Sequence, residues 1–71
     1  MKPNTLACGL FNGNILIVDA EKYFIIQELT GCSDKVLTLK WHPNFDYILA
    51  SGSSDQIVRV WDIKNVSIKL L

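Results

Sequence analysis

The side chains that could carry out nucleophilic or acid–base chemistry in this chain are few and widely spaced. Cys32 and the single histidine, His42, are the residue types of a thiol–imidazole pair, and Asp55 and Asp62 are those of a general acid and base. Cys32 precedes and His42 follows one extended apolar stretch, which at about 3.3 Å per residue would hold them at opposite ends of a strand. We therefore expect His42 to be structural or solvent-exposed, the two aspartates to close turns or strands, and the chain not to be an enzyme.

Other kinds of site have little support in the sequence. Its glycines do not form the strand-to-helix loop that binds phosphate, and neither Cys8 nor Cys32 has neighbours at the spacing of metal ligands. We expect no cofactor and two reduced thiols in an intracellular protein, cytoplasmic or nuclear. Seven basic residues balance seven acidic ones, so no charged field selects nucleic acid or a membrane surface. No apolar run approaches the ~20 residues that a membrane helix requires.

The elements that position these side chains are predicted to be strands. Short apolar segments are separated by clusters of glycine, asparagine, aspartate, serine and proline, which is typical of strands and turns. Asn12-Gly13 is the strongest hairpin signal, because a two-residue turn requires positive φ at both positions. Asp55-Gln56 marks a second turn. Strands are expected at residues 5–9, 14–18, 23–29, 36–41, 47–53, 57–62 and 67–71.

The chain contains an internal repeat. Leu6-Ala7-Cys8-Gly9 aligns with Leu49-Ala50-Ser51-Gly52 at a shift of 43 residues, and the same shift brings Asp19 onto Asp62. The same shift therefore aligns the two copies both at a strand and at the end of the hairpin that follows it. A period of about 40 to 45 residues is that of a four-stranded propeller blade.

The second copy of the repeat resembles a WD repeat. The segment Leu49-Ala50-Ser51-Gly52-Ser53-Ser54-Asp55-Gln56-Ile57-Val58-Arg59-Val60-Trp61-Asp62-Ile63 is similar to the end of such a repeat, and Val36-Leu37-Thr38-Leu39-Lys40-Trp41-His42-Pro43 is similar to its first strand. The resemblance implies an all-β fold of antiparallel four-stranded blades in an incomplete β-propeller. Residues 1–30 would be the last three strands of one blade, and residues 31–71 a second blade. Because such a propeller closes only with several more blades, usually about seven in all, the chain is expected to be a fragment or a truncated gene model.

The resemblance also implies a set of hydrogen-bonded side chains that locks each blade. In the family a His, a Ser or Thr, an Asp and the Trp form this set, and here Ser51 (or Ser53), Asp55 and Trp61 fill three of the places. The Trp61 indole can only donate, so it needs an acceptor such as a serine hydroxyl when it is buried. Cys32 stands where the family usually has His. A weak thiol donor would then replace an imidazole, and the lock is expected to be looser.

A partner-binding rim is the functional feature that the resemblance implies. In WD propellers the turn between the second and third strands and the loop that enters the first strand share one rim, which commonly receives partners. The corresponding residues here are Phe11, Asn12, Ser33, Asp34, Lys35, Ser54 and Asp55. Phe11 is either an anchor for an interface or a side chain folded back onto its own hairpin.

Two functions of different class are compatible with this rim. The favoured one is a scaffold segment that presents the rim to other proteins or peptides, as part of a multi-subunit complex and together with the remaining blades. The alternative is a propeller that binds RNA or DNA in a ribonucleoprotein or chromatin complex. A nucleic-acid face should gather basic residues, whereas here they are scattered from Lys2 to Lys69, which favours the scaffold.

The missing neighbours also lead to an expectation about exposed surface. Residues 5–9 should form a strand with an unpaired edge. Ile15, Ile17, Leu49, Val58 and Val60 are expected on the outward sheet faces, which further blades would cover.

Overall fold

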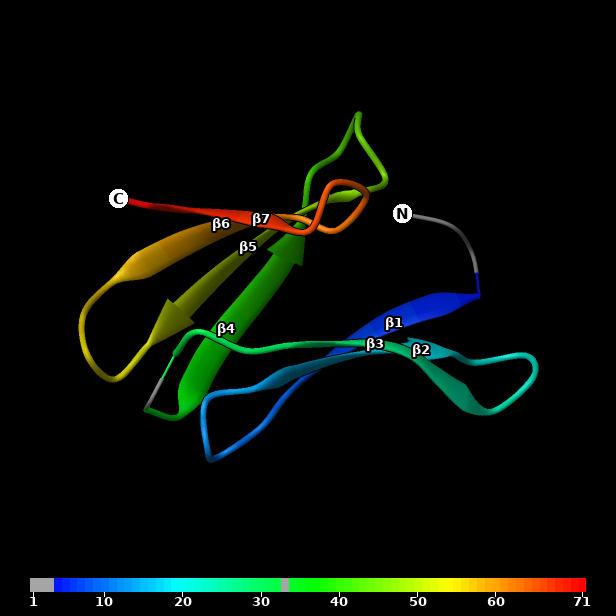
Figure 1. Cartoon of the computed structure of the whole chain (residues 1–71), viewed down its shortest axis with the longest axis horizontal. Helices are drawn as coiled ribbons and strands as arrows, with labels where there is room; N and C mark the ends of the chain where they lie inside the picture. The colour runs from blue at the N-terminus through cyan, green and yellow to red at the C-terminus, as the bar shows by residue number, and fades with distance from the viewer. Residues whose placement is uncertain (1–3, 33) are drawn as a thin grey trace.

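All regular structure in the computed structural model, which describes residues 4–32 and 34–71, is β-sheet. The strands are β1 (Thr5–Gly9), β2 (Ile15–Asp19), β3 (Phe24–Leu29), β4 (Val36–Trp41), β5 (Ile48–Ser53), β6 (Val58–Asp62) and β7 (Ser67–Leu70). Strands β1 to β3 form one antiparallel sheet and β4 to β7 form a second, both in chain order (Figure 1). The predicted fold class is confirmed. Within the described ranges, no helix is long and apolar enough to cross a membrane.

The first hairpin differs from the expected two-residue turn. The Leu10 amide donates to the Asn14 carbonyl at 2.9 Å, and the Gly13 amide donates to the Leu10 carbonyl at 3.1 Å. Of the pair at the predicted turn, Gly13 alone has a positive φ, 95°. The turn therefore holds three residues and ends on a left-handed glycine, and the expectation of positive φ at both Asn12 and Gly13 is wrong. This longer turn explains why β2 begins at Ile15, one residue later than predicted.

The 43-residue shift is also visible in the backbone of the two sheets. Gln56 lies at the position of Gly13 in the second copy, and it has a φ of 67°. At the other end of the strands, Tyr23 and Val66 are again 43 residues apart, with φ of 58° and 53°. Asp19 and Asp62 both accept hydrogen bonds from the amides two and three residues further along. Asp62 is thus a turn-capping residue, as expected.

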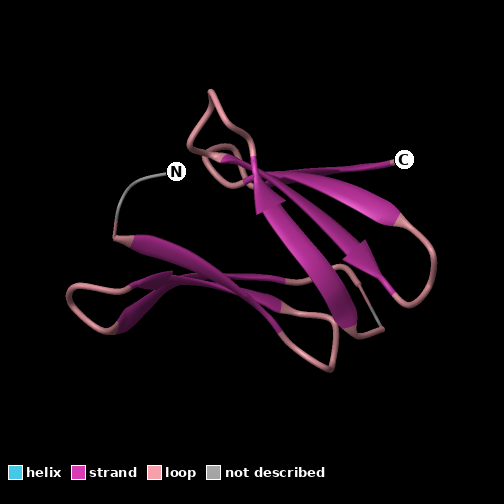
Figure 2. Cartoon of the chain, turned by 180° about the vertical axis from the view of Figure 1, so that it is seen from behind, coloured by secondary structure: helices cyan, strands magenta, loops and turns pink. Residues whose placement is uncertain are grey.

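The two sheets bury their facing sides against each other. Ile15, Ile17 and Leu29 of the first sheet form one cluster with Leu49 and Trp61 of the second. The registers explain this set, because Ile15 lies opposite Leu29 and Leu49 lies opposite Trp61, which puts the members of each pair on one face. Figure 2 shows the two sheets from behind as separate layers, with the loops gathered at the strand ends.

The prediction of which side chains point outward from the sheets is only partly confirmed. Ile15, Ile17 and Leu49 are buried between the sheets, so the expectation that they lie outward is wrong. Val58 and Val60 do lie outward, since Trp61 turns to the core and side chains alternate along β6. The outward face of the first sheet instead carries Leu6 and Ile25, both about half exposed.

Candidate functional site

Trp61 is held in the core by packing and by one hydrogen bond. Its side chain is buried, with 4% of its surface exposed. The indole Nε1 donates to Ser51 Oγ on the neighbouring strand β5 at 2.9 Å. Ser51 is itself buried. The only polar atom of the indole is a donor, so this contact meets its full hydrogen-bonding requirement inside the core.

Asp55 is the centre of a second cluster, at the end of the β5–β6 hairpin. Its carboxylate accepts hydrogen bonds from the Ser53 hydroxyl, from the Ile57 amide at 3.1 Å, and from Arg59 at 2.9 and 3.3 Å. The hydrogen bond from the Arg59 guanidinium holds the pKa of Asp55 well below its usual range. The Ser53 hydroxyl and the Ile57 amide lower this pKa further, and burial opposes them. The cluster thus fixes a charged carboxylate beneath the hairpin tip.

Cys32 lies at the edge of this cluster. It is buried, and its thiol contacts the Asp34 carbonyl oxygen at 3.1 Å and Asp55 Oδ2 at 3.8 Å. The four positions of the predicted lock are therefore divided into two groups: Ser51 bonds Trp61, whereas Cys32 contacts Asp55. No hydrogen bond within the described part of the chain joins the two groups. Ser53, the other serine considered, belongs with Asp55.

Arg59 is the member of the cluster that sequence reasoning missed. Its side chain is buried, with 6% of its surface exposed, and it forms an ion pair with Asp55 at 2.9 Å. A third hydrogen bond runs from Arg59 to Ser53 Oγ at 3.0 Å. The signal was present in the spacing, because Arg59 stands two residues before Trp61 in one strand and must share its inward face. A buried arginine also calls for an anionic partner, and Asp55 lies four residues before it.

The predicted rim residues lie together above this cluster. The backbone of Ser54 donates to the Lys35 carbonyl at 3.1 Å, and the amide of Val36 donates to Leu10 at 3.2 Å, so both repeats meet here. Phe11 is 83% exposed, and therefore the alternative in which it folds back onto its hairpin is wrong. The Lys35 ammonium stands 5.4 Å from the centroid of the Phe11 ring. Ser33, the remaining rim residue of the prediction, lies outside the described residues.

The side chains of the other rim residues shape their own loops. Asn12 Oδ1 accepts from the Asn14 amide at 3.0 Å, and Asp34 Oδ1 accepts from the Lys35 amide at 2.8 Å. Gly13 brings the two loops together, because a Cβ atom there would lie 2.5 Å from the Cys32 carbonyl oxygen and 2.6 Å from that of Asp34. Only glycine allows both this approach and the positive φ of the turn.

His42 has a structural role, in agreement with the expectation. Its Nδ1 accepts hydrogen bonds from the amides of Asn44 at 3.0 Å and Phe45 at 3.2 Å, so the imidazole closes the turn that follows β4. Cys32 precedes the same strand, at its other end. The two residues are therefore not a thiol–imidazole pair.

The Asp55 cluster leads to a prediction about acid sensitivity. The pKa of Asp55 is lower in the folded protein than the value of about 3.9 of an unfolded chain, so its contribution to stability is complete above that value and decreases as the pH falls below it. Asp55→Asn should reduce the unfolding free energy at neutral pH. In this variant the unfolding free energy should also decrease less as the pH is lowered. Urea unfolding of the full-length protein from about pH 7 to pH 3 measures this. Asp46→Asn is the matched control, since it leaves the cluster intact; an equal acid response in wild type and Asp55→Asn would contradict the prediction.

Comparison with known proteins places these features in a family. The sequence profile of the family described as WD domain, G-beta repeat, matches residues 24–62. The ribosome biogenesis protein YTM1 of Saccharomyces cerevisiae is 38% identical over 68 residues, which cover 90% of this chain and 15% of the relative. The periodic tryptophan protein 1 homolog of Drosophila melanogaster is 54% identical over 37 residues, which cover 52% of this chain and 8% of that protein.

A solved structure has the same arrangement of sheets. The crystal structure of the Cps50 (Swd1) β-propeller domain of Myceliophteria thermophila superposes with a TM-score of 0.84 and 26% identity, over 90% of this chain and 19% of that domain's chain. The chain thus spans 4–15% of the length of the relatives it matches. With its repeat at the 43-residue shift, its buried Trp61 and the matched profile over more than half of its residues, this chain belongs to the WD-repeat family.

Proposed function

We propose that the chain is two adjacent blades of a WD propeller that serves as a scaffold for other proteins. Residues 1–30 supply the last three strands of one blade, and residues 31–71 supply the next blade. The single observation that carries the proposal is the rim, where the Phe11 hairpin, the loop at Lys35 and the Ser54 turn meet. The Asp55 cluster holds this surface in shape from below and has no catalytic role.

The chemistry of the rim favours a protein or peptide partner. Phe11 offers a large exposed aromatic surface, Lys35 a cation beside it, and Asp34 a half-buried acid next to Lys35. Aromatic side chains are enriched at protein interfaces and the surrounding rim is polar, so an exposed aromatic beside polar and charged residues suits such an interface. One relative is named as a GATOR2 complex protein and another as a ribosome biogenesis protein, which supports a role for this chain in a larger assembly.

Nucleic-acid binding is less well supported by the same surface. Of the six rim side chains described, only Lys35 is basic. Arg59, directly below, is buried and paired with Asp55, so it cannot reach a phosphate. A reader of nucleic acid needs several cations on one face, and this rim presents one.

Phe11→Ala tests the scaffold proposal in the full-length protein. We expect it to weaken binding of the stably co-purifying subunits at least tenfold (~1.4 kcal/mol), as measured by quantitative affinity purification followed by titration with the identified subunit. Tyr23→Ala is the matched control, because Tyr23 is an equally exposed aromatic at the opposite ends of the strands. Equal binding by wild type and Phe11→Ala, or an equal loss in both variants, would count against a role for this rim.

A further inference from the structure

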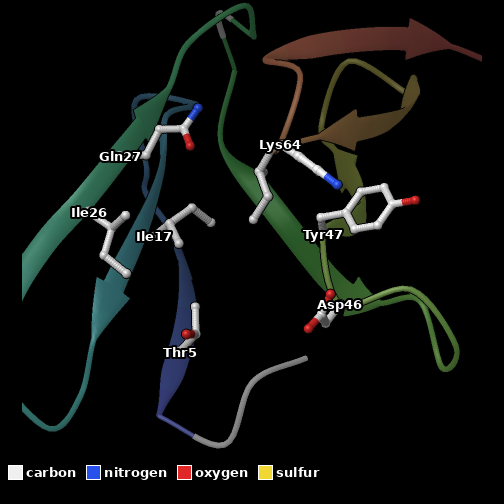
Figure 3. Close-up of a pocket in the computed structure, with 8 residues that line it drawn as sticks. Thr5, Ile17, Ile26, Gln27, Asp46, Tyr47 and Lys64 are labelled. Atoms are coloured by element: carbon white, nitrogen blue, oxygen red, sulfur yellow. The ribbon is translucent and has the colours of Figure 1, made fainter.

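A concave surface lies between the two sheets, away from the rim. It is lined by Thr5, Ile17, Ile26, Gln27, Asp46, Tyr47, Ile63 and Lys64, and we call it the inter-sheet groove (Figure 3). The β5–β6 hairpin shows its position. The rim residue Ser54 follows the end of β5, whereas the groove residue Tyr47 precedes its start. There the Tyr47 carbonyl accepts a hydrogen bond from the amide of Ile63, another groove residue, at 3.0 Å. The groove and the rim are therefore at opposite ends of the strands.

The apolar part of the groove lining comes from both sheets. Ile17 and Ile26 belong to the first sheet, and Ile63 and Tyr47 flank the strands of the second. The hollow has a volume of about 490 Å³, within the range of about 300–1,000 Å³ of ligand-binding pockets. Ile26 is about half exposed although it faces this hollow. An apolar group of a partner that entered here would be removed from water on two sides.

Two opposite charges mark the wall formed by the second sheet. Figure 3 shows Asp46, Tyr47 and Lys64 on the side of the second sheet, across the hollow from Thr5, Ile17, Ile26 and Gln27 of the first. The Lys64 ammonium stands 5.4 Å from the centroid of the Tyr47 ring. In the part of the chain that the structure describes, the one ion pair joins Arg59 to Asp55, so Asp46 and Lys64 are each available to a charged ligand.

We propose that the inter-sheet groove binds an extended segment of a partner protein, with an apolar side chain between a basic and an acidic residue. The basic residue would pair with Asp46, the apolar side chain would enter between Ile17 and Ile26, and the acidic residue would pair with Lys64. The opposite charges of the wall determine which charged residue of the segment lies beside Asp46 and which beside Lys64. The side-chain carboxamide of Gln27, which also lines the groove, can both donate to and accept from the backbone of such a segment.

The separation of the charges gives a test that does not require the natural partner. The probe is a phage-displayed library of random heptapeptides, selected on the folded full-length protein. Wild type is expected to enrich peptides with an apolar residue between a basic and an acidic one. The variant Asp46→Lys, which makes both charged residues of the wall basic, should instead enrich peptides with an acidic residue on each side of the apolar one. The Asp46 side chain is exposed, so the change leaves the core intact. Enrichment of the same peptides by both proteins, or of none by wild type, would overturn the proposal.

Titration with a selected peptide separates this groove from the rim. Ile26→Asp is expected to weaken binding of the fluorescently labelled peptide at least tenfold, because it places a carboxylate on the apolar wall. Phe11→Ala should leave that affinity unchanged, since Phe11 lies at the opposite end of the strands. A loss with Phe11→Ala and none with Ile26→Asp would show that the peptides bind the rim and would refute the groove. Failure of the groove would leave the scaffold role of the rim standing.

Discussion

Trp61→Ala is expected to lower the free energy of unfolding of the propeller by about 3–5 kcal/mol, as large truncations in protein cores do. The indole is buried in the cluster that joins the two sheets, between Leu49 on its own sheet and the isoleucines of the other. Removing it leaves a cavity that the surrounding strands cannot close, because their register is held by backbone hydrogen bonds on both sides. Equilibrium urea unfolding of the full-length protein measures the loss.

Two further variants separate the packing of Trp61 from its hydrogen bond. Ser51→Ala leaves the buried indole N–H without its acceptor and should cost about 1–3 kcal/mol. In Trp61→Phe/Ser51→Ala both polar partners are absent, so the cost of the unsatisfied N–H disappears and only the loss of ring volume remains. Trp41→Ala, at a partly buried tryptophan at the edge of the same cluster, should have a smaller effect than Trp61→Ala. A change below about 1 kcal/mol in Trp61→Ala would show that the indole is not part of the core.

The order of the strands could be predicted from sequence because the turns have strong local signals. Asp19 and Asp62 cap the same turn in the two copies of the repeat, and the 43-residue shift brings one onto the other. Gly13 and Gln56 show the limit of that signal. Both have positive φ at equivalent positions, but a glutamine does not predict this conformation, which is determined by the length of the hairpin rather than by the residue.

The faces of the strands were harder to predict than their positions. In β2 four consecutive residues, Ile15 to Val18, are apolar, so alternation cannot show which pair points to the neighbouring sheet. The structure buries Ile15 and Ile17. The burial of Arg59 was not predicted, because a charged residue in an apolar strand is usually assigned to the solvent side. Only the three-dimensional proximity of Asp55 makes its burial favourable. The inter-sheet groove depends on how two sheets are oriented, which no local pattern encodes.

The chain of residues 1–71, purified alone, is expected to self-associate or to be partly unfolded in dilute buffer. Its two sheets bury one face each against the other, but Leu6 and Ile25 on one outward face and Val58 on the other remain about half exposed. Apolar patches of this kind on a β-sheet favour association. The edge strand β1 adds to this tendency, because it pairs through its ladder only with β2 and carries no charged residue.

Sedimentation velocity at several protein concentrations tests this expectation, with the full-length protein as the reference. The isolated chain should sediment as oligomers or as a broad distribution, and the longer protein as one well-defined species. Leu6→Lys/Val58→Lys is an informative variant, since each charge is placed on a different outward face without touching the core cluster. It should shift the isolated chain toward monomer, because like charges on the outward faces oppose their association. A wild-type chain that is monomeric and unfolds cooperatively would show that the cluster around Ile15, Leu49 and Trp61 is sufficient for stability, and that the outward faces do not require neighbouring blades.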